Sequence, residues 1–503
     1  MSRSTGAEFW IKSRTKMADV ESLLRRPAGA NGRRPAPDFA VELIGRFRKP
    51  LVALWLMAGD AIAVCCAVAC SDALFSLRQP PLLRSFFAIP LLIGIFWAFG
   101  LYSGVGPSPY ERFSSRLRGV LGFAAVACAY GAPAGELGRL LVAASVDAAL
   151  LLALGHYAEA ATRSLMIRAG VWGARTAVVG CDESGTKLAR TLLSEPALGL
   201  APVGFIATRG ESASNTQGLA LPMIGTTADL RSVRDEVEVA ILTSAEDAPS
   251  FAEAAQKAAP EWRLLLAENA EGLPSLWART RTLGSAIGIE LRFDLGQRRS
   301  RVLKRAFDLA VAVPAALLVA PIVGVAALAI QCVDPGPPFY RQERIGRNGA
   351  LFRMLKLRSM YRDAEQRLAQ HLCADPRARE EWRQYFKLRR DPRVLPLIGR
   401  FLRCASIDEL PQLWNVIRGD MSLVGPRPLP TYHLDSFDSG FRTLRAAVRP
   451  GMTGLWQVSA RGDTDADAVK AQDLFYLRNW SILLDAYVLL ETLPAVLSGR
   501  GAR

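Results

Sequence analysis

Histidine is scarce in this sequence and its cysteines are scattered, so two common kinds of site are not indicated. The three histidines, His156, His371 and His433, lie far apart in the chain. The eight cysteines show no C-x-x-C spacing, which argues against a zinc site and against a thiol redox motif. We interpret the cysteines as small core residues of a protein in a reducing compartment.

A secretory signal peptide is also missing, because the first thirty residues lack an apolar core. Residues 1–48 are polar and rich in Arg, Pro and Gly, which predicts a disordered cytoplasmic tail. Over all 503 residues, 50% are hydrophobic while the net charge is +15, and this combination predicts a membrane protein with basic cytoplasmic parts. No nucleic-acid-binding module is evident, so membrane lipids and nucleotide phosphates are the expected partners, and nucleic acid is not.

Four apolar stretches follow the tail, at approximately 50–74, 86–104, 119–134 and 139–161, and predict a bundle of four transmembrane helices within residues 49–165. Asp60 and Asp147 lie inside the first and fourth stretches without an evident basic partner, and we expect them to pack inside the bundle. Basic residues before the first stretch, between the second and third, and after the fourth are expected in the cytoplasm. They are Arg46, Arg48, Lys49, Arg112, Arg116, Arg118, Arg163 and Arg168.

Residues 172–297 alternate short apolar strands with helical segments, which predicts a Rossmann-like cytoplasmic α/β domain. Expected strands include 176–180, 203–206, 239–243 and 264–266, with a helix near 185–194. Gly180 and Gly185 would suit a phosphate-binding turn, but Asp182 replaces the middle glycine of the G-x-G-x-x-G pattern. A scaffold or regulatory role is therefore favoured over nucleotide binding.

The most informative stretch is CASIDELPQLWNVIRGDMSLVGPRP, from Cys404 to Pro428, with the adjacent carboxylates Asp408 and Glu409. One carboxylate can attack phosphorus to form an acyl phosphate, while its neighbour holds a hard cation. Ser406 stands where an N-cap would, which predicts that both acids lie in the first turn of a helix that favours an anion. The alternative is purely structural, because Ser406-x-x-Glu409 before an apolar run is also a capping box.

Six sequence blocks occur in one order around this stretch. They are Lys304–Asp308, Phe339–Gln342, Phe352–Met360, the Asp408-Glu409 peptide, Gly419–Pro428 and Arg449–Gln457. Together they closely resemble the bacterial sugar transferases, which are monotopic polyprenyl-phosphate phosphoglycosyl transferases that start capsule, exopolysaccharide and O-antigen (lipopolysaccharide) repeat units. The resemblance covers residues 301–503, and the N-terminal half is similar to the large members of the undecaprenyl-phosphate galactose phosphotransferase type.

The uncharged run from Leu309 to Ile330 is long enough to cross a membrane, but it contains Pro314 and Pro321. A simple crossing would export the basic segment that follows, which the distribution of charge opposes. Proline removes a helical hydrogen bond and bends the axis, so the chain can enter and leave on one face. The family resemblance likewise implies a re-entrant helix over 305–331 that is broken at Pro321.

The resemblance further implies which side chains do the chemistry. Asp408 and Glu409 would be catalytic, and Glu409 would also hold the cofactor Mg²⁺. Other family motifs supply the expected substrate-binding residues, which are Lys356, Arg358, Arg427, Arg449, Gln457 and Asp473. Asp485 is expected instead on the surface of an amphipathic helix, 480–497, that lies on the membrane.

The fold class predicted is therefore a membrane protein of α plus α/β type: a four-helix transmembrane bundle, a Rossmann-like domain, and a mainly α catalytic domain with a re-entrant helix. The implied reaction moves a sugar 1-phosphate from a UDP-sugar to polyprenyl phosphate and releases UMP, through a covalent phosphosugar–Asp408 intermediate. It would take place on the cytoplasmic face of a bacterial inner membrane. The partners are then a UDP-sugar, polyprenyl phosphate and membrane lipids, with a homodimer left open.

Two other classes of protein remain as alternatives. A membrane-tethered nucleotide-sugar dehydratase or epimerase also joins apolar spans to a Rossmann domain, but it needs an intact G-x-G-x-x-G and a Y-x-x-x-K pair, and this sequence has neither. A non-enzymatic scaffold of a polysaccharide complex would have no reason to keep the Asp-Glu and Pro-Arg-Pro peptides together.

Overall fold

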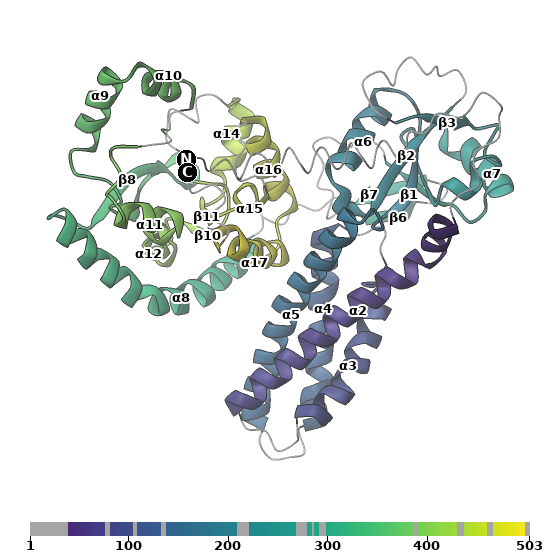
Figure 1. Ribbon diagram of the computed structural model, residues 1–503, viewed down its shortest axis with the longest axis horizontal. Helices are drawn as coiled ribbons and strands as arrows, with labels where there is room; N and C mark the ends of the chain where they lie inside the picture. The colour runs from purple at the N-terminus through teal and green to yellow at the C-terminus, as the bar shows by residue number, and fades with distance from the viewer. Residues whose placement is uncertain are drawn as a thin grey trace.

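The structure is a computed structural model. It describes residues 39–75, 81–103, 108–131, 137–208, 221–267, 279–283, 286–290, 298–385, 388, 391–429, 437–459 and 466–497. The predicted disordered tail therefore lies mostly outside the described residues, and its last part, 39–48, is helical. Helices predominate. In chain order, an N-terminal group of helices is followed by a unit with a parallel sheet and then by a C-terminal unit (Figure 1).

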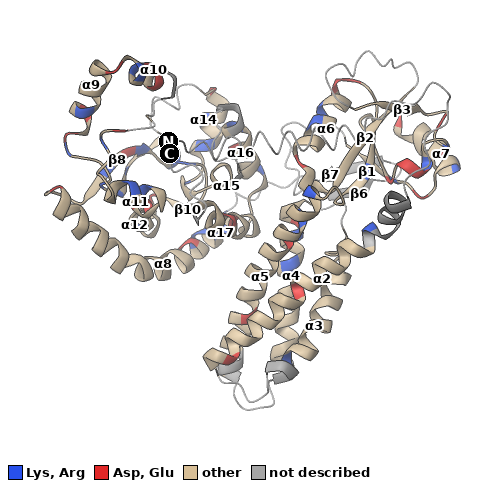
Figure 2. Ribbon diagram, in the orientation of Figure 1, with Lys and Arg blue, Asp and Glu red and all other residues tan. Residues whose placement is uncertain are grey.

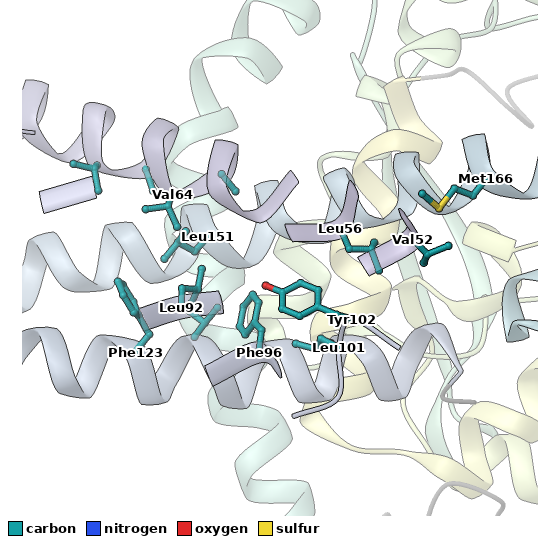
Figure 3. Close-up of a cluster of buried hydrophobic side chains, with 14 of the residues drawn as sticks. Val52, Leu56, Val64, Leu92, Phe96, Leu101, Tyr102, Phe123, Leu151 and Met166 are labelled. Carbon is teal, nitrogen blue, oxygen red and sulfur yellow. The ribbon is translucent and has the colours of Figure 1, made fainter. Parts of the chain in front are cut away.

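Four helices form the N-terminal group: α2 (Phe39–Phe75), α3 (Pro81–Ala98), α4 (Pro109–Gly131) and α5 (Leu137–Arg168). Their apolar side chains interlock along the group, and Figure 3 shows Leu56, Leu92 and Phe96 among them. Within the described ranges, Pro50–Phe75 of α2 and Leu141–Arg168 of α5 are long and apolar enough to cross a membrane, and α3 contributes the shorter apolar segment Arg84–Ala98. The helix α4 does not meet the same criterion, because its first half is polar.

Two of the basic residues between the second and third predicted spans lie inside the helical group rather than in a connecting loop. Arg112 and Arg116 lie on α4 and are buried in the helical group, at 1% and 2% exposure. Arg116 pairs with Asp60 of α2 and, at 2.9 Å, with Glu159 of α5. Asp60 is buried in the helical group, as predicted, but the expectation that it has no basic partner is wrong. Its partner comes from a segment that the sequence alone places between two spans. Burial of such charges requires this pairing.

The α/β unit is a five-stranded parallel sheet with the order β3-β2-β1-β4-β5. Two helices, α6 (Glu183–Ser194) and α7 (Ala248–Ala258), cover opposite faces of it, because Val178 of β1 packs with Leu192 of α6 while Val179 packs with Phe251 of α7. The period of two along a strand explains this alternation. The strands are β1 (Ala174–Val179), β2 (Leu200–Ala207), β3 (Met223–Thr226), β4 (Val239–Leu242) and β5 (Arg263–Leu266).

The turn after β1 is built around Asp182 rather than a glycine. The Asp182 side chain accepts a hydrogen bond of 2.8 Å from Gly185 N and caps α6. Gly180 adopts a φ of +111°, and a Cβ on Gly185 would lie 2.3 Å from Gly180 O, so both glycines serve the close packing of the turn. A carboxylate thus occupies the helix end where a dinucleotide-binding fold places a pyrophosphate.

An antiparallel pair of strands, β6 (Arg279–Leu283) and β7 (Ala286–Glu290), precedes the C-terminal unit in the chain. The C-terminal unit itself consists of helices around small two-stranded sheets. The hairpin β8 (Phe339–Ile345) and β9 (Leu351–Leu357) is antiparallel, and β10 (Ser422–Val424) pairs in parallel with β11 (Gly451–Thr453). The remaining helices are α8 (Arg298–Val333), α9 (Ala364–Ala374), α10 (Pro376–Tyr385), α11 (Ile398–Cys404), α12 (Gln412–Arg418), α14 (Ser439–Ala446), α15 (Leu455–Ser459), α16 (Ala466–Asn479) and α17 (Ile482–Leu497).

The long helix α8 curves along one side of the C-terminal unit (Figure 1) and carries no charged residue along its middle (Figure 2). Near its start, Asp308 accepts hydrogen bonds from Ser422 Oγ at 2.8 Å and Leu423 N at 3.1 Å. Just beyond its end, Asp334 accepts one of 2.6 Å from Arg358. Both ends are therefore fastened to the same unit, while apolar side chains such as Leu317 and Leu318 remain exposed on the helix.

Where a break at Pro321 is predicted, α8 is one continuous, curved helix (Figure 1). The helix α8 continues through both Pro314 and Pro321, and it begins at Arg298, before the expected residue 305. Each proline lacks one N–H donor, but the hydrogen bonds of the neighbouring turns persist, so the axis can bend while the helix stays continuous.

The last helix, α17, joins the C-terminal unit to the N-terminal helices. Its residue Glu491 lies 2.8 Å from His156 Nε2 of α5, and Tyr157 of α5 donates a hydrogen bond of 2.7 Å to Leu490 O. The expected surface position of Asp485 on this helix is wrong. Asp485 is fully buried and accepts a hydrogen bond of 2.7 Å from Lys304 of α8, an interior pairing that helical periodicity alone could not reveal.

Candidate active site

Asp408 and Glu409 lie in a single 3₁₀ turn, η6 (Ile407–Glu409), between α11 and α12. The prediction that they occupy the first turn of an α-helix is wrong, because α12 begins at Gln412 after Pro411. The capping-box alternative also fails, since among the described residues the Ser406 side chain makes no hydrogen bond that caps the turn. Ser406 instead adopts a φ of 55°, which bends the chain sharply into the turn.

The helix α12 is fastened to the strand beside it through a buried amide. Asn415 accepts a hydrogen bond of 2.9 Å from Leu355 N and donates one of 2.9 Å to Arg353 O, so it pairs with the main chain of β9. At the far end of α12, Arg305 of α8 donates to the carbonyls of Val416 and Ile417 at 2.6 and 2.7 Å. These contacts hold the turn with the two acids against β9.

Two of the predicted basic residues converge on Glu409. Lys356 Nζ of β9 lies 2.8 Å from Glu409 Oε1, and Arg427 lies 3.7 Å from the same oxygen. Arg427 follows β10, and its side chain is 43% exposed, so it is open to a ligand. One site with two acidic and two basic side chains is therefore built from three separate segments, 351–357, 407–409 and 425–428.

The main chain of Arg427 is held by a buried ion pair that includes a residue which our sequence reasoning missed. Arg445 of α14 donates to Asp473 Oδ2 of α16 at 2.9 Å and also to the carbonyl oxygen of Arg427. Asp473 therefore acts on the site through Arg445. The sequence offered no signal for Arg445, since it lies on a short helix that also carries the exposed Arg442.

The glycine that precedes Pro426 permits the close approach that forms this loop. A Cβ on Gly425 would lie 2.8 Å from Arg449 O, and Pro426 O accepts a hydrogen bond of 2.9 Å from Gly451 N. The loop that carries Arg427 is thus fastened to β11 on one side and, through Ser422 and Asp308, to α8 on the other. The position of Arg427 therefore depends on segments throughout the C-terminal unit.

Burial of the Asp408 carboxyl raises its pKa to about 6, and the neighbouring charge of Glu409 adds to this effect. Lys356 and Arg403 oppose the rise, because positive charge favours the carboxylate. Asp408 is thus a carboxyl group poised to ionise near neutral pH, a property typical of reacting groups.

The other predicted substrate-binding residues have different surroundings. Arg358 is largely buried and binds both the side chain and the carbonyl oxygen of Asp334, which fastens the end of α8. Gln457 is buried on α15, and its Nε2 lies 3.4 Å from Met452 O. The Arg449 guanidinium lies 3.9 Å from the position that a Cβ on Gly419 would take, at the end of α12 away from the acids. Their roles toward substrate stay predictions.

A metal site made wholly of protein side chains is not evident: in the part of the chain that the structure describes, no group of three or more His, Cys, Asp or Glu side chains could hold an ion. Magnesium, however, is commonly bound by one or two carboxylates together with substrate phosphates. The adjacent hard oxygen donors of Asp408 and Glu409 fit that pattern, with Glu409 as the predicted ligand.

Comparison with known proteins identifies the family of this chain. Residues 299–499 match the model of the family described as bacterial sugar transferase. The undecaprenyl-phosphate galactose phosphotransferase of Salmonella typhimurium is 34% identical over 70% of this chain and 74% of its own length. The exopolysaccharide production protein ExoY of Sinorhizobium fredii is 41% identical over 40% of this chain and 88% of its own length.

A third relative, the UDP-glucose:undecaprenyl-phosphate glucose-1-phosphate transferase of Caulobacter vibrioides, is 40% identical over 39% of this chain and 70% of its own length. The family match and the long similarity to the Salmonella protein confirm the resemblance inferred from the six sequence blocks. The chain therefore belongs to the bacterial sugar transferase family, and it is a phosphoglycosyl transferase.

Proposed function

We propose that this protein transfers a sugar 1-phosphate from a UDP-sugar to undecaprenyl phosphate, as the first membrane step of exopolysaccharide, capsule or O-antigen synthesis. The proposal is carried by the convergence of four side chains, Asp408, Glu409, Lys356 and Arg427. Two carboxylates and two cationic groups suit attack by an oxygen nucleophile on a diphosphate. The names of the relatives support the lipid acceptor and differ in the sugar, galactose in one and glucose in another.

The first step uses Asp408 as the nucleophile. Its ionised carboxylate attacks the β-phosphorus of the UDP-sugar, the bond from that phosphorus to the bridging oxygen breaks, and UMP leaves with the electron pair. The sugar phosphate is then esterified to Asp408 as an acyl phosphate. In the second step, a phosphate oxygen of undecaprenyl phosphate attacks the same phosphorus and the Asp408 carboxylate leaves.

Lys356 and Arg427 would bind the diphosphate and offset the charge that gathers on the leaving UMP. Both side chains contact Glu409 in this structure. A phosphate group that enters the site would therefore replace Glu409 as the anionic partner of these two side chains. Bound Mg²⁺ would supply further charge neutralisation of the diphosphate. Glu409, with the donor phosphates, would hold it.

The site must lie next to the membrane, because the proposed acceptor is a lipid. We propose that α8 is re-entrant: its exposed apolar middle is in the inner membrane while both fastened ends stay with the C-terminal unit in the cytoplasm. In the same scheme, α2 to α5 are the four transmembrane helices, and a Rossmann-like unit, 172–297, lies in the cytoplasm as a scaffold. A homodimer is compatible with this arrangement.

A membrane preparation of the full-length protein tests the proposal. With undecaprenyl phosphate and a panel of UDP-sugars, we expect UMP release for at least one sugar, together with a lipid-linked sugar diphosphate identified by mass spectrometry. UMP release without any lipid product would overturn the proposed transfer. The appearance of a dehydrated or epimerised nucleotide sugar would support the alternative enzyme class.

A further inference from the structure

The helix α17 contacts two parts of the molecule at once (Figure 1), and different faces of it serve the two contacts. The side chains that turn into the C-terminal unit are Leu484, Asp485, Val488 and Thr492. The side chains and main chain that meet the N-terminal helices belong to Tyr487, Leu490 and Glu491. Each set repeats at intervals of three or four residues, as one face of a helix requires. The position of α17 therefore depends on both parts.

The contact with the N-terminal helices is built from aromatic rings around Tyr487. Its ring centroid lies 5.7 Å from that of Phe113 on α4 and 5.9 Å from that of His156 on α5. Tyr110 of α4 adds a third ring at 6.3 Å, and its hydroxyl oxygen lies 2.9 Å from Ser481 Oγ, just before α17. Packed rings contribute more than their buried area alone. The Tyr487 ring thus occupies a socket formed by α4 and α5.

A buried ion pair holds the two helices of this socket together. Arg116 of α4 pairs with Glu159 of α5 at 2.9 Å, and both side chains are almost fully buried. On each helix the charged residue lies one turn from a ring of the socket, Phe113 on α4 and His156 on α5. Because separating the pair would leave a buried charge without its partner, the socket is a fixed surface against which α17 is placed.

The other face of α17 reaches the start of the loop that carries Arg427. Asp485 accepts a hydrogen bond of 2.7 Å from Lys304 Nζ, which also donates one of 3.0 Å to Val424 O. The Tyr476 hydroxyl lies 2.8 Å from Asp485 Oδ1 and 3.0 Å from Val424 O. Asp485 therefore positions both groups that contact the Val424 carbonyl oxygen, three residues before Arg427.

A second contact links α17 to the same loop through β11. Thr492 Oγ1 lies 2.8 Å from Thr453 Oγ1, and the main-chain oxygen of Thr453 accepts a hydrogen bond of 2.9 Å from Gly425 N. Close-packed interiors are only slightly compressible and transmit displacements. A shift of α17 must therefore move the polar groups around Val424 and Gly425 with it.

We propose that α17 couples the docking of the N-terminal helices to the position of Arg427, so that Tyr487 is a positioning residue for the sugar-phosphate transfer. The proposal rests on the proposed function, in which Arg427 binds the donor diphosphate. The N-terminal helices then do more than hold the catalytic unit at the membrane, because their socket helps to place Arg427 beside Glu409. Without the Tyr487 ring, α17 moves and the loop that carries Arg427 moves with it.

Removal of the Tyr487 ring tests the proposal in the full-length protein in membranes. Tyr487→Ala should lower kcat/KM for the UDP-sugar about fivefold or more. In the proposed mechanism this parameter reports the first step alone, because the donor reacts with Asp408 before the lipid does. Tyr487→Phe keeps the ring and should keep the wild-type value. Leu493→Ala changes an exposed side chain of the same helix and should also behave as wild type.

The same contact can be weakened from the side of the N-terminal helices. Tyr157→Phe removes the hydroxyl group that donates to Leu490 O, and it should lower kcat/KM for the donor by a smaller factor than Tyr487→Ala does. A different result would overturn the proposal: a higher KM for undecaprenyl phosphate in Tyr487→Ala, with kcat/KM for the donor unchanged. The N-terminal helices would then only hold the catalytic unit at the membrane.

Hydrogen exchange measures the coupling without an activity assay. Peptides that cover 422–428 should exchange faster in Tyr487→Ala than in the wild type or Tyr487→Phe, while peptides that cover 351–357 stay unchanged. Equal exchange of 422–428 in all three proteins would overturn the coupling. If Tyr487→Ala unfolds, the milder Tyr157→Phe decides by the same two measurements. If the wild type formed no lipid-linked product, the proposed function would fail, whereas faster exchange of 422–428 would still support the coupling.

Discussion

Arg445 and Asp473 form a buried ion pair whose Nε to Oδ2 distance is 2.9 Å, and the same guanidinium donates to the carbonyl oxygen of Arg427. Neither side chain touches Glu409, yet both determine where the Arg427 main chain lies. A pair that acts through a third residue in this way is a positioning device, and its loss should affect chemistry as well as stability.

We predict that Asp473→Asn lowers kcat/KM for the donor by more than tenfold, because the buried Arg445 loses its charged partner and releases the Arg427 carbonyl. Breaking a buried pair should also lower the free energy of unfolding by about 3–5 kcal/mol. The double variant Arg445→Met, Asp473→Leu separates the two effects, since apolar replacement of both partners can restore stability. Recovery of kcat/KM together with stability in the double variant would reduce the pair to a packing role.

Asp408→Asn should reduce turnover to background and abolish the covalent intermediate, since an amide cannot form the acyl phosphate. Incubation with a UDP-sugar labelled in the sugar, without lipid, should label an Asp408 peptide in the wild type alone. Glu409→Gln should be severely impaired through weaker metal binding, with part of the rate recovered at high Mg²⁺. Wild-type kinetics that require both substrates bound at once, with no labelled peptide, would favour direct attack by the lipid phosphate.

Lys356→Gln should lower kcat/KM by roughly a hundredfold, as expected when a charge that stabilises a transition state is removed. Arg353→Gln on the same strand provides a matched control, because Arg353 is an exposed side chain that contributes only its main-chain carbonyl to the contact with Asn415. Assays of both variants at equal ionic strength distinguish a local effect from a general loss of positive charge. Equal losses in the two variants would contradict a specific role for Lys356.

The pH dependence follows from the raised pKa of Asp408. In the proposed mechanism Asp408 attacks as an ionised carboxylate, and its pKa is about 6. The value of kcat/KM should therefore increase as the pH rises through about 6 and be low at more acidic pH. Removal of the neighbouring negative charge in Glu409→Gln should move the profile of the residual activity to lower pH. Removal of the positive charge in Lys356→Gln should move it to higher pH. A flat profile between pH 5 and 7 would exclude Asp408 as the ionising group.

In the proposed topology, the re-entrant path of α8 depends on its prolines. Cys373 is exposed on α9, and a variant that keeps it as the sole cysteine should resist an impermeant thiol reagent in intact cells. Adding Pro321→Leu restores an N–H donor and should let part of the population straighten, with lower activity and some labelling from outside. Labelling of Cys373 in the parent variant would disprove the cytoplasmic location.

The family of this protein could be recognised from its sequence because the motifs that identify it are short, recognisable peptides that occur in one order. Asp408 and Glu409 are adjacent, and the peptides around Lys356 and Arg427 resemble family motifs. The order of strands and helices in the α/β unit follows from local apolar patterning, which acts over a few residues. The family assignment and the location of most elements therefore needed no coordinates.

The tertiary structure alone decided which distant residues meet. Asp60 and Arg116 are 56 positions apart and pair inside the helical group, while Lys304 reaches Asp485 across 181 positions. No periodic pattern encodes such pairings, because they depend on how whole helices pack after they form. The 3₁₀ turn at 407–409 has the same origin: Ser406 fits a capping box by residue type, but the fastening of α12 to β9 through Asn415 determines the backbone around it.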